Sequence, residues 1–173
     1  MKKLLGIVVL GLLLSGNAYA ENLKFTKIIN LDKPWGSSFI NKDELIITEK
    51  NGKIKIVNIN SGEVSEVDHN LNFLKVGQGG LLDILHKDNF LWISYSEDRG
   101  DWKTSTSIAK AKLDKKELNF KNIFQAEPPI DSGYHFGSRL AIKDNYLFAS
   151  AGERGQGMIA QDPTKHPGSI IRI

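Results

Sequence analysis

The residues best suited to chemistry lie between Asp131 and Ile173, where polar side chains stand between apolar runs. His135 lies between Gly133 and Gly137, and Arg139 follows in the same short run. An imidazole that is neutral near pH 7 can accept a hydroxyl proton, and flanking glycines free the backbone to direct it into a cleft. The competing interpretation is structural, because a lone histidine is more often hydrogen-bonded at a strand end and such an arginine forms a surface salt bridge. A Gly-rich loop in the same stretch adds Glu153, Arg154, Gln161 and Asp162.

A second candidate is the run GQGGLLDILH, from Gly77 to His86. Its glycines permit positive φ angles or the close approach of a flat ligand, and Gln78 brings both a donor and an acceptor to that place. A phosphate-binding loop is excluded, because no G-K-[ST] follows and no helix begins after the glycines. On spacing alone, a tight turn that leads into a central strand is the favoured interpretation.

The other histidines fit structural roles. His69 lies in a polar loop, His86 in a turn region and His166 just before a Pro-Gly pair. The four histidines have no metal-ligand spacing and the chain has no Cys, so we expect no zinc site and assign no metal ligands. Arg172, in an apolar final run, faces either a central channel or the solvent.

The N-terminus carries the pattern of a cleavable signal peptide. Lys2 and Lys3 precede the apolar run Leu4–Leu14, and Ala18–Ala20 forms an A-x-A site, which predicts a signal peptide at 1–20 with cleavage after Ala20. A membrane anchor is the weaker alternative, because the apolar run is shorter than the ~20 residues that span a bilayer. Without Cys there is no lipobox, so we expect a soluble periplasmic or secreted protein with no membrane span after cleavage. No basic stripe is interleaved with aromatics, which argues against nucleic-acid binding.

The rest of the chain predicts strands and turns, with no convincing helix. Asn51-Gly52 is a strong hairpin signal, and the alternation over 53–59 is typical of a half-buried strand. An apolar run, a Lys/Asn/Asp turn and an aromatic-apolar run recur three times, with Leu45, Phe90 and Tyr146 aligned. The expected strands are 23–30, 37–40, 45–48, 53–59, 64–67, 80–85, 90–95, 106–113, 118–124, 137–142, 146–151 and 169–173.

This repeat has the spacing of β-propeller blades, which run to about 40–50 residues. A propeller closes with about 4–8 blades, and this chain supplies about three, the last without its outer strands. We therefore expect residues 21–173 to be the N-terminal part of an incomplete propeller. A β-sandwich is the alternative, but it does not account for the repeat.

Several motifs in order resemble the glucose/sorbosone dehydrogenase family, most closely its soluble aldose sugar dehydrogenase branch. The resemblance covers essentially the whole chain after the signal peptide. The motifs are Pro34-Trp35, Leu45–Lys50, Gly52–Ile54, Gly77–His86, His135–Leu140, Gly152–Gly155, Ala160–Asp162 and Gly168–Ile173.

The resemblance implies a six-bladed β-propeller, of which this chain is an N-terminal fragment with about three blades. It implies pyrroloquinoline quinone (PQQ) and calcium as cofactors, and oxidation of the C1 hydroxyl of aldoses to lactones. His135 matches the family's general base while hydride passes to the quinone. Gln78 matches a quinone contact, and Arg139 is the second expected cofactor contact. The electron acceptor is not implied.

Two departures from the family's motifs bear on the site. Ser138 replaces the second glycine of HFGGR, and Glu153 replaces the aspartate of GDRG. The resemblance also places the calcium ligands and an Arg-Asn cofactor contact in later blades, so this chain alone is expected not to hold PQQ tightly. A non-enzymatic propeller that only binds is the alternative function, although it would need neither a base at His135 nor an amide at Gln78.

Overall fold

The structure consists of strands that follow one another along the chain. The computed structural model describes residues 24–173, so the predicted signal peptide lies outside the described residues. Within that range, twelve strands form three sheets, and the only helix is a short 3₁₀ helix, η1 (Gly157–Gln161). No helix in this part of the chain is long and apolar enough to cross a membrane. The expected all-β class is confirmed.

The first sheet is an antiparallel meander. Asn51-Gly52 forms the predicted turn between its second and third strands, with Gly52 at a φ of 103°. The prediction of an edge strand at 23–30 is wrong for the described residues 24–30, which form no strand. Phe25 is 90% exposed, so this segment has no apolar face packed on the sheet. The strands are β1 (Pro34–Phe39), β2 (Glu44–Glu49), β3 (Ile54–Asn58) and β4 (Val64–His69).

The second sheet departs from the prediction at its outer edge. The expected single strand at 118–124 is divided into β8 (Glu117–Leu118), which pairs with β4 in parallel, and β9 (Lys121–Gln125), which pairs with β7. Asn70 causes the division, because its side chain accepts from Phe120 N at 2.8 Å and donates to Phe120 O at 3.1 Å. β8 therefore belongs to the first sheet, and the second sheet consists of β9 with β5 (Leu81–Lys87), β6 (Phe90–Asp98) and β7 (Thr104–Lys112).

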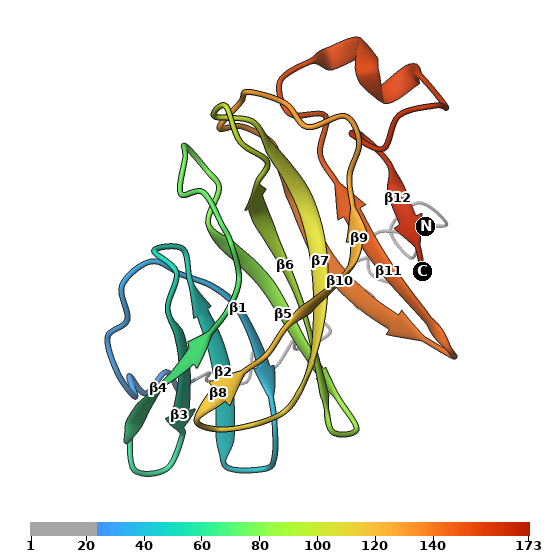
Figure 1. The fold of residues 1–173 in the computed structure, drawn as a ribbon. Coiled ribbons are helices and arrows are strands. Elements are labelled where there is room, and N and C mark those ends of the chain that lie inside the picture. The colour runs from blue at the N-terminus through green and yellow to red at the C-terminus, as the bar shows by residue number, and fades with distance from the viewer. Residues whose placement is uncertain (1–23) are drawn as a thin grey trace, which may run out of the picture.

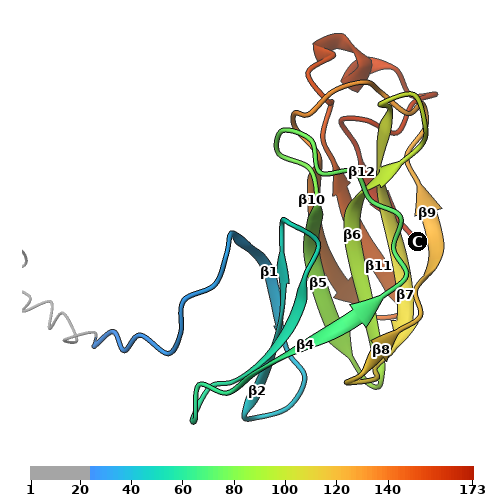
Figure 2. The same ribbon diagram turned by 60° about the vertical axis from the view of Figure 1, so that its left-hand side comes forward.

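The third sheet has three strands in the described chain, β10 (Gly137–Lys143), β11 (Tyr146–Ala151) and β12 (Ile170–Arg172). Figures 1 and 2 show the three sheets side by side in chain order, with β5 between β1 and β10. One apolar cluster lies between the first two sheets and includes Ile46, Leu81 and Ile93. A second joins the last two sheets through Ile108 and Leu140. Three successive sheets confirm the predicted blades and exclude a two-sheet sandwich.

A side-chain hydroxyl occupies the same place in each blade, and it is buried in the first two, at Thr48 and Ser94. The first strand of every sheet has a register shift, where one backbone N–H is free to donate to the second strand's side chain. The donors are Gly36 N to Thr48, Asp83 N to Ser94, and Arg139 N to Ser150, each at 3.0 Å. The predicted alignment of the repeats is therefore wrong by one residue in the first copy, where Glu44 rather than Leu45 corresponds to Phe90 and Tyr146.

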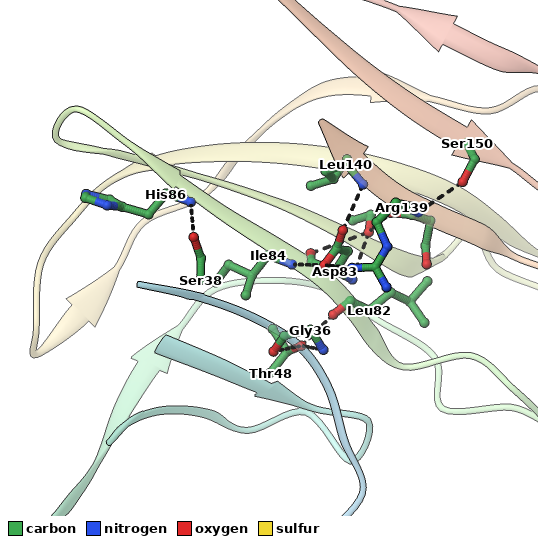
Figure 3. Close-up of polar contacts among 12 residues, drawn as sticks. Gly36, Ser38, Thr48, Leu82, Asp83, Ile84, His86, Arg139, Leu140 and Ser150 are labelled. Carbon is green, nitrogen blue, oxygen red and sulfur yellow. Dashed lines mark hydrogen bonds and ion pairs between the residues drawn. The ribbon is translucent and has the colours of Figure 1, made fainter. Parts of the chain in front are cut away.

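The same hydroxyls also join neighbouring blades (Figure 3). Thr48 donates to the Leu82 carbonyl. Ser94 donates to the Ser138 carbonyl at 2.7 Å. His86 N donates to Ser38 further along the same pair of first strands. Gly36 is required at this junction, because a Cβ there would lie 2.7 Å from the Asp83 Cα.

These contacts fix the direction of the first strands. Gly36 lies near Leu82 and Ser38 near His86, so β1 and β5 run the same way. Asp83 accepts from Leu140 N, and Lys87 Nζ donates to Asp144 O. The strands β5 and β10 therefore also run in the same direction. The loops that precede β1, β5 and β10 therefore lie at one end of the molecule, which brings the two candidate stretches together.

Candidate active site

The loops before β5 and β10 are joined by hydrogen bonds that involve their backbones and the side chain of Gln78. The Gln78 side-chain oxygen Oε1 accepts a hydrogen bond from His135 N at 2.9 Å. Gln78 N donates in turn to Gly133 O at 2.7 Å. Two residues chosen separately from the sequence, Gln78 and His135, are thus in direct contact. Lys50 reaches the same place from the first blade, since its Nζ donates to Gly77 O.

The glycines of GQGG serve this loop packing. Gly77 has a φ of 52° and Gly80 a φ of 144°, which side-chain-bearing residues rarely adopt. A Cβ at Gly77 would collide with the Gly133 carbonyl, and one at Gly80 would collide with the Lys50 carbonyl. The expected tight turn is confirmed, but the strand that it leads into, β5, is the first strand at the edge of its own sheet.

His135 is paired with an acid that the sequence analysis did not assign to it. Its Nδ1 contacts the Glu153 Oε1, and Gly155 N donates to the same oxygen at 3.2 Å. The hydrogen bond from His135 is the main reason that the pKa of Glu153 lies below its ordinary value of 4.5. Since an ionised carboxylate only accepts, Nδ1 carries a proton, and in the neutral ring this leaves the lone pair on Nε2. The GERG motif was visible as a departure from the family's aspartate, but its contact with His135 was not.

The backbone at His135 is held in an uncommon conformation. Its φ is 47°, and that of Ser138 is 88°. Non-glycine residues in this region are uncommon and concentrate at functional sites. The His135 side chain is 53% exposed, so the imidazole that contacts Glu153 is also open to a ligand.

Arg139 is further along β10 and has its own acid partner (Figure 3). Its Nη1 donates to Asp83 Oδ1 at 3.1 Å, while Asp83 Oδ2 accepts from Leu140 N at 2.8 Å. The predicted salt bridge of Arg139 is present, but it is not purely a surface pair. The Asp83 side chain is buried, with 5% exposed, whereas the Arg139 side chain is 75% exposed. No contact among the described residues joins Arg139 to His135, and its role as a cofactor contact stays a prediction.

The remaining histidines bond backbone groups, as structural roles require. His69 Nε2 lies 2.7 Å from Gly52 O, His86 Nδ1 lies 3.2 Å from Phe39 O, and His166 accepts from Glu127 N at 2.9 Å. Arg172 lies over the Tyr146 ring, 4.9 Å from its centroid, at an exposed position.

Two other features of residues 24–173 bear on ligand binding. No group of three or more His, Asp or Glu side chains in this range could hold a metal ion. A hollow of about 480 Å³ lies between the Lys87–Phe90 turn and the Asp144–Tyr146 turn. These turns are at the far ends of β5 and β10 from Gln78 and His135, so the hollow is separate from the candidate site.

The fold and the site define a class of protein, part of a β-propeller with polar residues gathered at one end. The comparison with known families is specific. The chain belongs to the glucose/sorbosone dehydrogenase family, whose model matches residues 31–173. The family inferred from the motifs is thereby confirmed.

Individual relatives agree with this assignment. Aldose sugar dehydrogenase YliI of Escherichia coli (strain K12) is 31% identical over 153 residues, covering 83% of this chain and 41% of the relative. The apo structure of the soluble aldose sugar dehydrogenase from Escherichia coli has a TM-score of 0.77 at 30% identity, covering 83% of this chain and 44% of that one. The PQQ-bound aldose sugar dehydrogenase of Streptomyces coelicolor shares the fold, with a TM-score of 0.72 at 22% identity over 83% and 45% of the two chains. The chain thus spans less than half the length of these relatives.

Proposed function

We propose that the protein containing these residues oxidises the C1 hydroxyl of aldose sugars to lactones, with PQQ as cofactor and His135 as general base. The observation that carries the proposal is the His135–Glu153 pair beside Gln78, at the end of the blades where the preceding loops meet. Membership of the glucose/sorbosone dehydrogenase family supports the reaction class. The relative YliI, named as an aldose sugar dehydrogenase, supports an aldose as the substrate.

Glu153 prepares His135 for proton transfer. Because the carboxylate accepts from Nδ1–H, the Nε2 lone pair is available for the proton of the sugar hydroxyl. When Nε2 takes that proton, the imidazolium that forms lies against the ionised Glu153. The low pKa of Glu153 keeps its negative charge at neutral pH, and this charge stabilises the protonated ring.

Gln78 and Arg139 suit a planar, carboxylate-bearing cofactor such as PQQ. The Gln78 oxygen is already bound to His135 N, which leaves the side-chain NH₂ as a donor for a ligand next to the base. Arg139 gives one N–H to Asp83 and has an exposed guanidinium with further donors. When bound, the quinone would supply the acceptor for the hydride that leaves C1. The described residues offer no cluster for calcium, and no step is assigned to it.

Export is part of the same proposal. The predicted signal peptide at 1–20 supports a periplasmic or secreted location, where the enzyme would meet sugars outside the cytoplasm.

Replacement of His135 tests the proposal against a propeller that only binds. In the natural protein loaded with PQQ and calcium, His135→Ala is expected to lower the rate of aldose oxidation with a dye acceptor by ~10²–10⁴-fold, with the cofactor still bound. His86→Ala is the matched control, because His86 bonds only a backbone carbonyl and lies outside the site. An unchanged rate in His135→Ala would make His135 structural and favour the binding function.

A further inference from the structure

Arg154, next to the acid that pairs with His135, is buried and has no acidic partner in the described chain. Its exposed fraction is 2%. Burial lowers the pKa of its guanidinium to about 10, so it remains charged at neutral pH. A buried cation without a carboxylate depends on hydrogen bonds for its stabilisation, and every acceptor that it contacts is a carbonyl or hydroxyl oxygen.

Those acceptors come from two places. On one side, Arg154 Nε donates to Tyr134 O at 2.9 Å, and Nη2 donates to Ser132 O. On the other side, Nη1 donates to Thr104 O at 2.9 Å and Nη2 to Thr104 Oγ1 at 2.6 Å. Thr104 is the first residue of β7 in the second blade and is fully buried. The guanidinium therefore ties the loop before β10 to the neighbouring blade.

The same residue encloses the loop that carries His135. Its guanidinium carbon lies 3.7 Å from the centroid of the Phe136 ring, and its backbone N donates to His135 O at 3.3 Å. Arg154 thus contacts Tyr134 and Phe136, the neighbours of His135 in the chain, and also the carbonyl of His135 itself. Glu153 acts on the imidazole while Arg154 acts on the backbone beneath it.

We propose that Arg154 is a positioning residue for His135, which holds the loop 132–136 so that the imidazole stays against Glu153. The inference rests on the proposed role of His135 as the base. A planar fork with several donors is needed, because the contacts to Ser132, Tyr134 and Thr104 are made at once. Lysine keeps the charge but is a point donor, so it can replace only part of this arrangement.

The test measures the position of His135 separately from turnover. In the natural protein labelled with ¹⁵N-histidine, the Nδ1–H that contacts Glu153 is expected to give an exchange-protected proton signal. Glu153→Gln identifies the signal by altering it. Arg154→Gln is expected to abolish it and to lower kcat by ~10²-fold with little change in KM, since small misplacements of a catalytic group have costs of this size. Arg154→Lys is expected to restore part of both.

Arg99→Lys is the matched control, because Arg99 bonds Ser105 and Glu127 and not the loop 132–136. It is expected to keep both the signal and kcat. If Arg154→Gln does not fold, Thr104→Val removes one acceptor of Arg154 and is expected to weaken the signal and to lower kcat by less than Arg154→Gln does. An unchanged signal in the folded Arg154 or Thr104 variant would overturn the positioning role. Loss of the signal with unchanged kcat would support positioning and reject His135 as the base.

Discussion

Replacing Ser94 by alanine removes a hydroxyl that joins two neighbouring blades. Ser94 accepts from Asp83 N at 3.0 Å within its own sheet and donates to Ser138 O at 2.7 Å in the next. The Ser94 side chain is fully buried, and Ser138 is 2% exposed. Alanine therefore leaves a buried N–H and a buried carbonyl without this partner.

The size of the effect follows from those two groups. Each buried polar group left without a partner costs about 1–3 kcal/mol. Part of this is recovered by local rearrangement, so we expect the free energy of unfolding to fall by about 2–4 kcal/mol. The change also loosens β10 near its start, which is the strand that follows His135.

Urea unfolding of the natural protein and of Ser94→Ala measures this difference. Ser65→Ala is the matched control, because Ser65 is an exposed residue of β4 and its loss is expected to change stability by less than about 0.5 kcal/mol. If Ser94→Ala and Ser65→Ala are equally stable, the hydroxyl contacts do not hold the blades together and this reasoning is refuted.

Three further predictions concern the site and the N-terminus. Gly77→Ala is expected to destabilise the protein more than Gly100→Ala, as measured by thermal unfolding, because both have positive φ but only Gly77 would collide with Gly133. Glu153→Gln is expected to differ most in urea midpoint from the natural protein above pH 4.5 and to converge with it as the pH falls through the lowered pKa of Glu153, because a carboxylate with a depressed pKa stabilises only while ionised. A constant difference would argue against the hydrogen bond between His135 and the Glu153 carboxylate. N-terminal sequencing of the exported protein is expected to begin at Glu21, whereas an intact N-terminus would reject the signal peptide.

The strands were largely predictable because their signals are local. Asn51-Gly52 fixes its hairpin through backbone conformation alone, and the alternation around Ile54 follows from a sheet with one buried face. The division between β8 and β9 was not predictable, since it depends on Asn70, which reaches Phe120 from the loop after β4.

The site shows the same limit. His135 and Gln78 were found from their motifs, but the contact between them requires that β5 and β10 run side by side in one direction. Glu153 was noticed only as a substitution within a motif, and Arg154 was noted only as one polar residue of a loop. The one-residue error in aligning the first repeat concealed the recurring hydroxyls of Thr48, Ser94 and Ser150, which a correct alignment places at equivalent positions.

The most direct test of the central claim is a double-mutant cycle on the rate of cofactor reduction. The rate at which an aldose reduces the bound quinone is measured by stopped flow in His135→Ala, Glu153→Gln and the double variant. If Glu153 acts through His135, Glu153→Gln is expected to slow the natural protein and to cost nothing further in the His135→Ala background. Effects that multiply independently, or single variants as fast as the natural protein, would contradict the claim that the two residues work as one base.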